Sequence, residues 1–343
     1  MRTFASEDHR LHFPAAELSD GELVVPFERP SRVEHVRVRL AARGFPEPED
    51  PGPCDRPALA RVHDAGYLAF LESAWARWAE LGRAGELIPT SFPVRRMDAT
   101  RPPRAIDGLA GFYALAAETA ITAGTWPAAL SSAASAQAAA RTVAGGERAA
   151  FALCRPPGHH AGIDLYGGYC FLNNAALAVD VLLRAGHDRV ATLDVDFHHG
   201  NGTQDVFWRR GDVLTVSLHG HPEDAFPHFA GHADETGETE GAGANLNLPM
   251  RPGAAWPEWS AALERGLEGI ARFGASALVV SLGVDAFERD PISFFRLGSE
   301  DFVACGRRIR SLGLPTAFVL EGGYAIEEIG VNVVNALEGF EAG

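Results

Sequence analysis

The sequence predicts an α/β fold in which a mostly parallel sheet is covered by helices on both faces. From about residue 149 onward, short apolar runs rich in β-branched residues alternate with longer stretches of helical spacing. Near-continuous apolar runs are typical of strands buried on both faces, and the helices between them favour parallel pairing. The expected strands are Ala149–Leu153, Arg189–Val195, Val213–Leu218, Ala277–Leu282 and Thr316–Leu320.

Helical spacing also predicts the helices. They are expected at Val33–Leu40, Ala65–Leu81, Ala110–Ala120, the alanine-rich Ala128–Val143, Ala175–Arg184, Trp256–Phe273 and Ser299–Arg310. Ser299 suits the N-cap of its helix, and Gly313 suits the stop after it. Two Pro-rich segments, Phe45–Pro57 and Pro89–Pro103, are expected to be surface loops. No linker divides the chain, so we expect one domain over residues 1–343.

The composition restricts the partners and the compartment. Lys and Arg number 30 against 45 Asp and Glu, a formal charge of -15, which repels nucleic acid and anionic membranes and favours cationic ligands. Simple solubility also explains such a charge. Four cysteines (Cys54, Cys154, Cys170 and Cys305) form no C-x-x-C pair, and no apolar leader or membrane-length run is visible. We therefore expect a cytoplasmic protein with neither a nucleic-acid nor a membrane partner.

Polar side chains gather just after the predicted strands. One such run, Asp194–Gly202, ends the Arg189 strand, and Gly283–Asp285 and Glu321–Tyr324 end the strands at Ala277 and Thr316. In an open α/β sheet, ligands bind at the carboxyl ends of the strands. The pattern therefore predicts a functional site at this edge.

Asp196, His198 and Asp285 are candidate metal ligands. Asp196 and His198 are two residues apart, so on an extended segment they project to the same side. Two carboxylates and an imidazole with an open fourth position are typical of catalytic zinc. The alternative for Asp196 and His198 alone is an ion pair in a loop.

His159 and His160 are candidate acid–base groups, because they are adjacent in a loop stiffened by Pro and Gly after a strand. Asp194 and Asn201 are candidates to orient the two rings. Tyr324 follows two glycines and can donate a hydrogen bond to a developing oxyanion. A solvated His-His loop and an ordinary Gly-Gly-Tyr turn are the alternatives for these motifs taken singly.

Six motifs of the second half resemble, in order, the histone deacetylase superfamily. They are RPPGHH (155–160), GGYCFLNN (167–174), LDVDFHHGNGTQ (193–204), VSLHG (216–220), SLGVDAFERDP (281–291) and LEGGY (320–324). The first half resembles bacterial acetylpolyamine amidohydrolases at SEDH (6–9), DGELV (20–24), HDAGYL (63–68), TSFPVRR (90–96) and AAETAI (116–121). The resemblance to that branch is nearly full length.

This resemblance implies an arginase–deacetylase-like domain with a parallel sheet of about eight strands. It places one zinc ion per chain on Asp196, His198 and Asp285, whose bound water attacks the acetyl carbonyl. It makes His160 the general base and then acid, His159 its electrostatic partner, and Tyr324 the group that polarises the carbonyl. It also implies a structural K⁺ site at Asp194 and Ser217. Asn201 replaces the Asp frequent in histone deacetylases, so its histidine partner should be less strongly ionised.

The resemblance also implies the substrate, a small cationic acetylated amine. Tunnel walls are expected at Gly168, Tyr169, Phe226 and Ile292, and acids that contact distal amines at Asp107 and Glu118. A long loop at about residues 81–104 should lie at the rim of the active site, narrow the entrance and mediate a homodimer. The expected reaction is deacetylation of acetylputrescine, acetylcadaverine, acetylspermidine or acetylspermine. The alternatives are a protein or histone lysine deacetylase, a manganese ureohydrolase and a catalytically silent binding protein.

Overall fold

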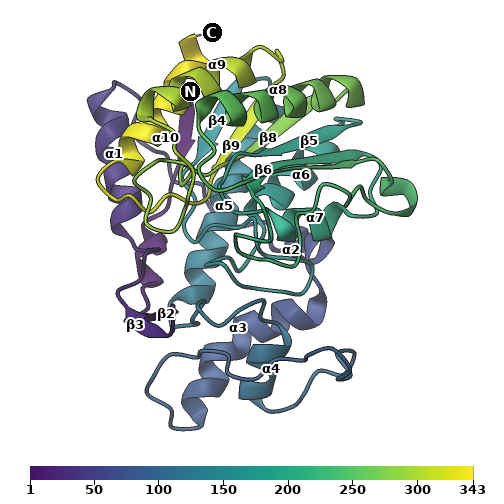
Figure 1. Ribbon diagram of the computed structural model, residues 1–343. Helices are drawn as coiled ribbons and strands as arrows, with labels where there is room; N and C mark the ends of the chain where they lie inside the picture. Colours follow the sequence, from purple (N-terminus) through teal and green to yellow (C-terminus); the bar gives the residue numbers. More distant parts are fainter. Residues whose placement is uncertain (343) are drawn as a thin grey trace.

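A parallel sheet forms the centre of the protein in the computed structural model, which describes residues 1–342 (Figure 1). Its seven strands lie in the order β1-β4-β9-β8-β5-β6-β7. They are β1 (Arg2–Phe4), β4 (Ala149–Ala152), β5 (Val190–Asp194), β6 (Val213–Gly220), β7 (Asn245–Met250), β8 (Ala277–Leu282) and β9 (Thr316–Leu320). A separate antiparallel hairpin consists of β2 (Glu17–Ser19) and β3 (Glu22–Val24).

Helices cover both faces of the sheet, and each face has its own hydrophobic core. Alternate strand residues point to opposite faces, so Ala317 and Val319 of β9 belong to one core, whereas Phe318 and Leu320 belong to the other. The first core includes α2 (Arg56–Val62), α3 (Ala65–Glu80), α4 (Ile106–Phe112), α5 (Thr125–Ala144) and α6 (Asn174–Arg184). The second includes α1 (Ser31–Ala42), α8 (Trp256–Phe273), α9 (Ser299–Arg310) and α10 (Ile329–Ala342). This arrangement confirms the predicted α/β fold.

The five strands expected from the sequence are present as β4, β5, β6, β8 and β9, but the sheet has seven strands and not about eight. Strands β1 and β7 were not predicted, because both lie at the edges of the sheet and lack the long apolar run of a central strand. β1 has only three residues, and β7 alternates Asn with Leu and contains Pro249. Proline is tolerated at a sheet edge, where a ladder hydrogen bond is not required.

One predicted helix is misplaced. The expected helix Ala110–Ala120 is wrong, since α4 ends at Phe112. The residues that follow use their backbone for distant pairing: the Leu115 N–H donates to the Tyr166 carbonyl at 2.7 Å, and the Ile121 N–H donates to the Leu87 carbonyl at 2.9 Å. Tertiary pairing therefore overrides a strong local helix propensity.

Two helix starts also differ from expectation. Helix α2 begins at Arg56, so the Pro-rich segment from Phe45 becomes helical near its end, whereas residues 89–103 contain neither helix nor strand. The N-cap of α9 is Gly298 in place of Ser299, and the Asp301 side chain accepts the Gly298 N–H at 2.8 Å. The sequence analysis also missed α2, α7 (Asn201–Phe207) and α10.

None of the helices over residues 1–342 is long and apolar enough to cross a membrane.

A buried cluster of charged side chains ties the N-terminal segment to the ends of two strands. Glu28 accepts hydrogen bonds from Arg32 Nη1 at 3.0 Å and from Arg155 Nε at 2.8 Å. All three side chains are at most 2% exposed. Arg32 Nε also donates to the carbonyl of Gly323 at 2.8 Å. Because Arg155 follows β4 and Gly323 follows β9, this cluster fixes the edge of the sheet at which the site lies.

Replacing Glu28 should therefore destabilise the protein. The substitution Glu28→Gln leaves two buried guanidinium groups without their countercharge, and we expect a loss of about 3–5 kcal/mol in the free energy of unfolding. The matched control is Glu34→Gln, because Glu34 pairs with the half-exposed Arg10 and should contribute about 0–1 kcal/mol. Chemical denaturation measures both, and equal losses would contradict a special role for the buried cluster.

Candidate active site

Three side chains that can hold a metal ion lie together at the carboxyl edge of the sheet. Asp196 and His198 follow β5, and Asp285 follows β8. Their ligand atoms all lie within 4.8 Å of one another, and the three residues are buried. His198 Nδ1 is 2.9 Å from Asp285 Oδ2 and 3.3 Å from Asp196 Oδ1. Two carboxylates and an imidazole suit Zn²⁺ and its neighbours in the first transition row, so the donor set fits the predicted metal.

Backbone N–H groups orient the two carboxylates. Asp285 Oδ1 accepts from Phe197 N at 2.7 Å, and Asp196 Oδ2 accepts from Gly322 N at 2.7 Å. The turn must approach closely at Gly322, because an added Cβ there would lie 2.5 Å from Asp196 Oδ2 and 2.6 Å from Asp285 Oδ2. Glycine is therefore required where the turn after β9 meets the carboxylates.

The carboxylates and the imidazole strongly perturb one another. Burial raises the pKa of Asp285 to about 8, and the neighbouring Asp196 charge acts in the same direction. Burial opposes the charge of His198, but hydrogen bonds to Asp196 and Asp285 raise its pKa to about 10. A proton on His198 thus offsets the carboxylate charge in the metal-free protein. A metal ion must displace that proton, so metal affinity should fall as the pH falls.

The two adjacent histidines have different partners. The His159 Nδ1–H donates to Asp194 Oδ2 at 2.9 Å, whereas the His160 Nδ1–H donates to the amide oxygen of Asn201 at 2.6 Å. The ring centroids are 4.1 Å apart. A histidine that donates from Nδ1 in its neutral form keeps a lone pair on Nε2. Both acceptors are among the residues that the sequence analysis named as candidates to orient the rings.

The surroundings of the two rings shift their pKa values in opposite directions. Burial lowers the pKa of His160 well below its usual range, and the charges of His159 and His198 lower it further. Burial also opposes the charge of His159, but Asp196 and Asp194 together raise its pKa well above the usual range. These shifts favour the charged form of His159 and the neutral form of His160 beside it.

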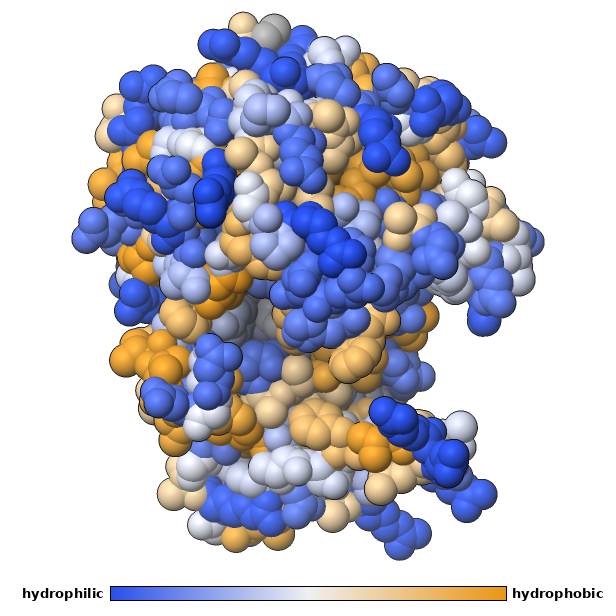
Figure 2. Space-filling view, in the orientation of Figure 1, coloured by the Kyte–Doolittle hydropathy of each residue, from blue (hydrophilic) through white to orange (hydrophobic). Residues whose placement is uncertain are grey.

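A cavity of about 350 Å³ adjoins these groups. The four predicted wall residues line it: Gly168, Tyr169, Phe226 and Ile292. Three of the predicted catalytic and metal-binding residues line it as well: His160, His198 and Tyr324. The backbone must come close at Gly168, where φ is +54° and an added Cβ would lie 2.2 Å from His160 Cδ2. The face of the molecule shown in Figure 2 is hollowed near its centre, with apolar and polar side chains at the margin.

Tyr324 is held at the cavity through its backbone and its ring. Its N–H donates to Asp290 Oδ2 at 2.7 Å, and Asp290 Oδ1 accepts from the N–H of the wall residue Ile292 at 3.1 Å. The Arg32 guanidinium lies 4.9 Å from the centroid of the Tyr324 ring. The sequence analysis quoted Asp290 within a motif but gave no role to it or to Arg32.

The acids that line the cavity differ in part from those expected. Glu118 lines the cavity, and its Oε1 accepts from Gly168 N at 2.8 Å. Asp107 is not among the lining residues; its side chain is 52% exposed and lies 3.5 Å from Arg83 Nη2. Glu17, which was not predicted, is buried, lines the cavity and accepts from Tyr169 Oη at 3.0 Å.

The hairpin that carries Glu17 had a recognisable signal. An Asp-Gly pair at Asp20 and Gly21, between two short runs of alternating polarity, is the typical turn of a two-residue β-hairpin.

Asp194 and Ser217, the expected monovalent cation residues, are register partners on β5 and β6. Ser217 Oγ lies 2.8 Å from His219 Nδ1.

Comparison with known proteins identifies the family. The histone deacetylase domain matches residues 26–340, and the chain belongs to the histone deacetylase family. The chain is 56% identical over 339 residues to an acetylpolyamine amidohydrolase of Mycoplana ramosa, covering 99% of each chain. It is 53% identical over 342 residues to acetylpolyamine amidohydrolase 1 of Pseudomonas aeruginosa, again covering 99% of each.

A solved structure shows the same fold. The crystal structure of an acetylpolyamine aminohydrolase from Burkholderia pseudomallei matches with a TM-score of 0.94 and 40% identity, covering 100% of this chain and 99% of the other. A histone deacetylase-like amidohydrolase of Pseudomonas aeruginosa is 38% identical, over 90% of this chain and 73% of its own length. The family resemblance predicted from the sequence is confirmed, and with it a hydrolase of a metal-dependent family.

Removing one donor of the trio should remove the metal. We expect Asp285→Ala to lose bound divalent metal and activity together, since two of three protein ligands remain. Asp224→Ala is the control, because Asp224 lines the cavity but is not part of the trio, and it should keep a full complement of metal. Metal content per chain measures both. Full occupancy in Asp285→Ala would exclude Asp285 as a ligand.

Proposed function

We propose that this protein is a zinc-dependent amidohydrolase that removes the acetyl group from N-acetylated polyamines. One observation carries the proposal: a buried donor trio and an imidazole with an amide partner lie at a cavity that the buried carboxylate of Glu17 and the half-buried carboxylate of Glu118 also line. The first two features suit hydrolysis of an amide, and the third suits an amine that carries a second positive charge. The names of the full-length relatives agree with this substrate.

The protein groups have separable roles in this reaction. Asp196, His198 and Asp285 would hold zinc, which polarises a carbonyl and lowers the pKa of water toward about 7 when bound. His160 accepts a proton from the attacking water at Nε2 and delivers it to the departing amine nitrogen. His159, as a cation beside Asp194, stabilises the negative charge that develops. The Tyr324 hydroxyl group donates a hydrogen bond to the acetyl oxygen as that oxygen becomes negatively charged.

Tyr324 acts on the transition state in this scheme. Tyr324→Phe should lower kcat by about 10²–10³ with little change in KM, as expected for the loss of one oxyanion donor. Steady-state kinetics on acetylputrescine with zinc-loaded protein gives both constants. His160→Ala should be at least as damaging, because it removes the proton shuttle. An unaltered kcat in Tyr324→Phe would show that Tyr324 is not the donor.

The substrate class is tested by comparing two kinds of acetylated amine. We expect acetylputrescine to exceed an acetyl-lysine peptide in kcat/KM by at least about tenfold, because a desolvated charge-assisted hydrogen bond contributes about 1.5–3 kcal/mol. Glu118→Gln should erode the preference and leave hydrolysis of a neutral acetamide nearly unchanged. Equal activity on a histone peptide and on acetylputrescine would favour the alternative, a protein lysine deacetylase.

Glu17 should make the preference for cationic substrates depend on pH. Burial raises the pKa of Glu17 to about 7, so its charge is largely absent at pH 6 and largely present at pH 8. The ratio of kcat/KM for acetylputrescine to that for neutral N-butylacetamide should therefore rise with pH, by about three- to tenfold. Groups that act on the amide itself affect both substrates and cancel in the ratio. A ratio as steep in Glu17→Gln as in the wild-type protein would exclude Glu17 as the source.

The remaining features of the proposal concern assembly and location. We propose a homodimer in which the loop at residues 81–104 of one copy narrows the entrance of the other, because that loop lines no part of its own cavity. Asp107, beside this loop, would then reach a substrate only across the interface. A structural K⁺ at Asp194 and Ser217 and a cytoplasmic location belong to the same proposal. A catalytically silent binding protein is disfavoured because all of the expected chemical groups are present.

A further inference from the structure

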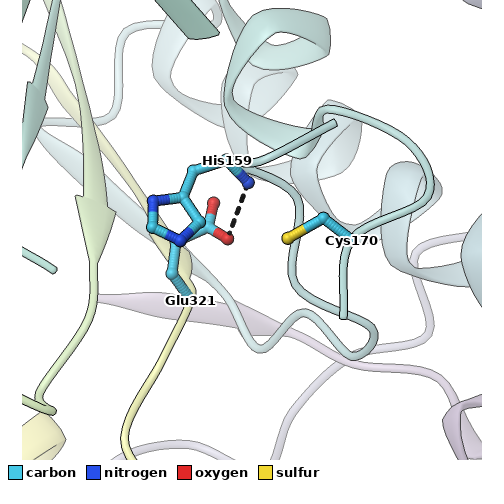
Figure 3. Close-up of side chains that lie close together, drawn as sticks. All are labelled: His159, Cys170 and Glu321. Carbon is cyan, nitrogen blue, oxygen red and sulfur yellow. Dashed lines mark hydrogen bonds between the residues drawn. The ribbon is translucent and has the colours of Figure 1, made fainter. Parts of the chain in front are cut away.

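Glu321 is a fully buried acid that the mechanism above does not use. It follows β9 directly and begins the turn that ends at Tyr324. Its Oε2 accepts two backbone hydrogen bonds from the histidine loop, from Gly158 N at 2.6 Å and from His159 N at 3.1 Å. Figure 3 shows the second of these bonds, with the Glu321 carboxyl group reaching across to the His159 backbone. One carboxyl group therefore joins the loop of the general base to the turn of the tyrosine.

The backbone of Glu321 is itself held firmly. Its N–H donates to the Leu282 carbonyl at 3.1 Å, and its carbonyl accepts from Arg32 Nη2. The next residue, Gly322, donates its N–H to Asp196 Oδ2 at 2.7 Å and accepts from Val284 N at 3.0 Å. This end is therefore fixed, and the Glu321 side chain spans the gap from the tyrosine turn to the backbone of the histidine loop, beside the link that Glu28 and Arg32 make between Arg155 and Gly323.

The second oxygen of Glu321 takes no part in this connection. Oε1 is buried without a hydrogen-bond partner among the described residues. Cys170 and His159 lie close by, with ligand atoms within 4.8 Å of those of Glu321. A second metal site is disfavoured, because Oε2 already accepts two N–H groups and burial raises the pKa of the Cys170 thiol well above its usual range. Burial also raises the pKa of Glu321 to about 7, so a full negative charge is not a requirement of the connection.

We propose that Glu321 is a positioning residue whose reach, and not its charge, sets the spacing between the histidine loop and the tyrosine turn. The proposal rests on the proposed deacetylase function, in which His160 and Tyr324 must act on the same acetyl group. Displacements of about 1 Å between catalytic groups and substrate can cost about 10²-fold in rate. A side chain of fixed length between the two loops is a direct way to prevent such displacement.

Two conservative variants separate reach from charge. Glu321→Gln keeps the length and presents an amide oxygen to Gly158 N and His159 N, but it carries no charge. Glu321→Asp keeps the charge but is shorter by one carbon–carbon bond, about 1.5 Å. We expect Glu321→Gln to retain kcat within about threefold of the wild-type protein and Glu321→Asp to lose at least about tenfold. KM for acetylputrescine and zinc content should stay at wild-type values in both.

A matched control tests whether shortening any loop-holding carboxylate has the same effect. Glu235 Oε2 accepts from Gly231 N at 2.9 Å and from Gln204 Nε2 at 2.7 Å, and Glu235 does not line the cavity. Glu235→Asp should therefore keep the wild-type kcat. A kcat in Glu321→Asp equal to or above that of Glu321→Gln would overturn the proposal, and so would a loss of zinc that parallels the loss of kcat.

Crystal structures of the two variants provide a test that does not depend on activity. The histidine loop of Glu321→Asp should move relative to the turn at Gly322–Tyr324, whereas that of Glu321→Gln should superimpose on the wild-type protein. Unmoved loops in Glu321→Asp would refute the positioning role. Inactivity of the zinc-loaded wild-type protein on every acetylated amine would instead refute the proposed function, and the structures would still decide the role of Glu321.

Discussion

The fold depends on keeping several acids buried at one edge of the sheet. Asp194, Asp196, Asp285, Asp290 and Glu321 are each at most 7% exposed, and burying such charges is unfavourable unless each is paired or hydrogen-bonded. All five accept at least one backbone N–H, from loops that follow different strands. These bonds link the loops to one another, because the loops after β4, β5 and β9 each donate to an acid that follows a different strand. A divalent cation on Asp196 and Asp285 would offset the charge that remains.

The same constraint separates the roles of the two histidines. A carboxylate on Nδ1 stabilises a charged ring, whereas an amide oxygen orients a ring without ionising it strongly. His159 has Asp194 as its partner, and His160 has Asn201. These partners act together with burial and the charge of Asp196, which shift the pKa values of the two rings in opposite directions. Their opposite pKa shifts provide the separation of acid and base roles that hydrolysis requires.

The central strands and the floor of the site could be predicted from the sequence, because parallel strands are buried on both faces and their carboxyl ends meet at one edge. The prediction was weaker where long-range contacts decide the structure. Ala110–Ala120 has helical propensity, yet Leu115 pairs with Tyr166. Glu17 lies on a short hairpin far along the chain from the motifs of the second half, and only folding brings it to Tyr169. Asp107 was expected at the substrate, but it does not line the cavity and its carboxylate lies 3.5 Å from Arg83.

Specificity within this family must come from the mouth of the cavity and not from its floor. In the proposed reaction the floor groups act on the acetyl amide, which all candidate substrates share, so they would not distinguish a polyamine from a lysine side chain. Glu17 and Glu118 line the cavity, and both also contact its wall, at Tyr169 Oη and Gly168 N, so in the proposed reaction they are the groups that would meet the part of the substrate that differs. A change in charge at the mouth therefore also changes how the wall is held. If a cationic amine draws either acid away from the wall, the complex gains an ion pair but the protein loses the hydrogen bond between that acid and the wall. The net selectivity for a cationic substrate is then the difference between the free energies of these two interactions.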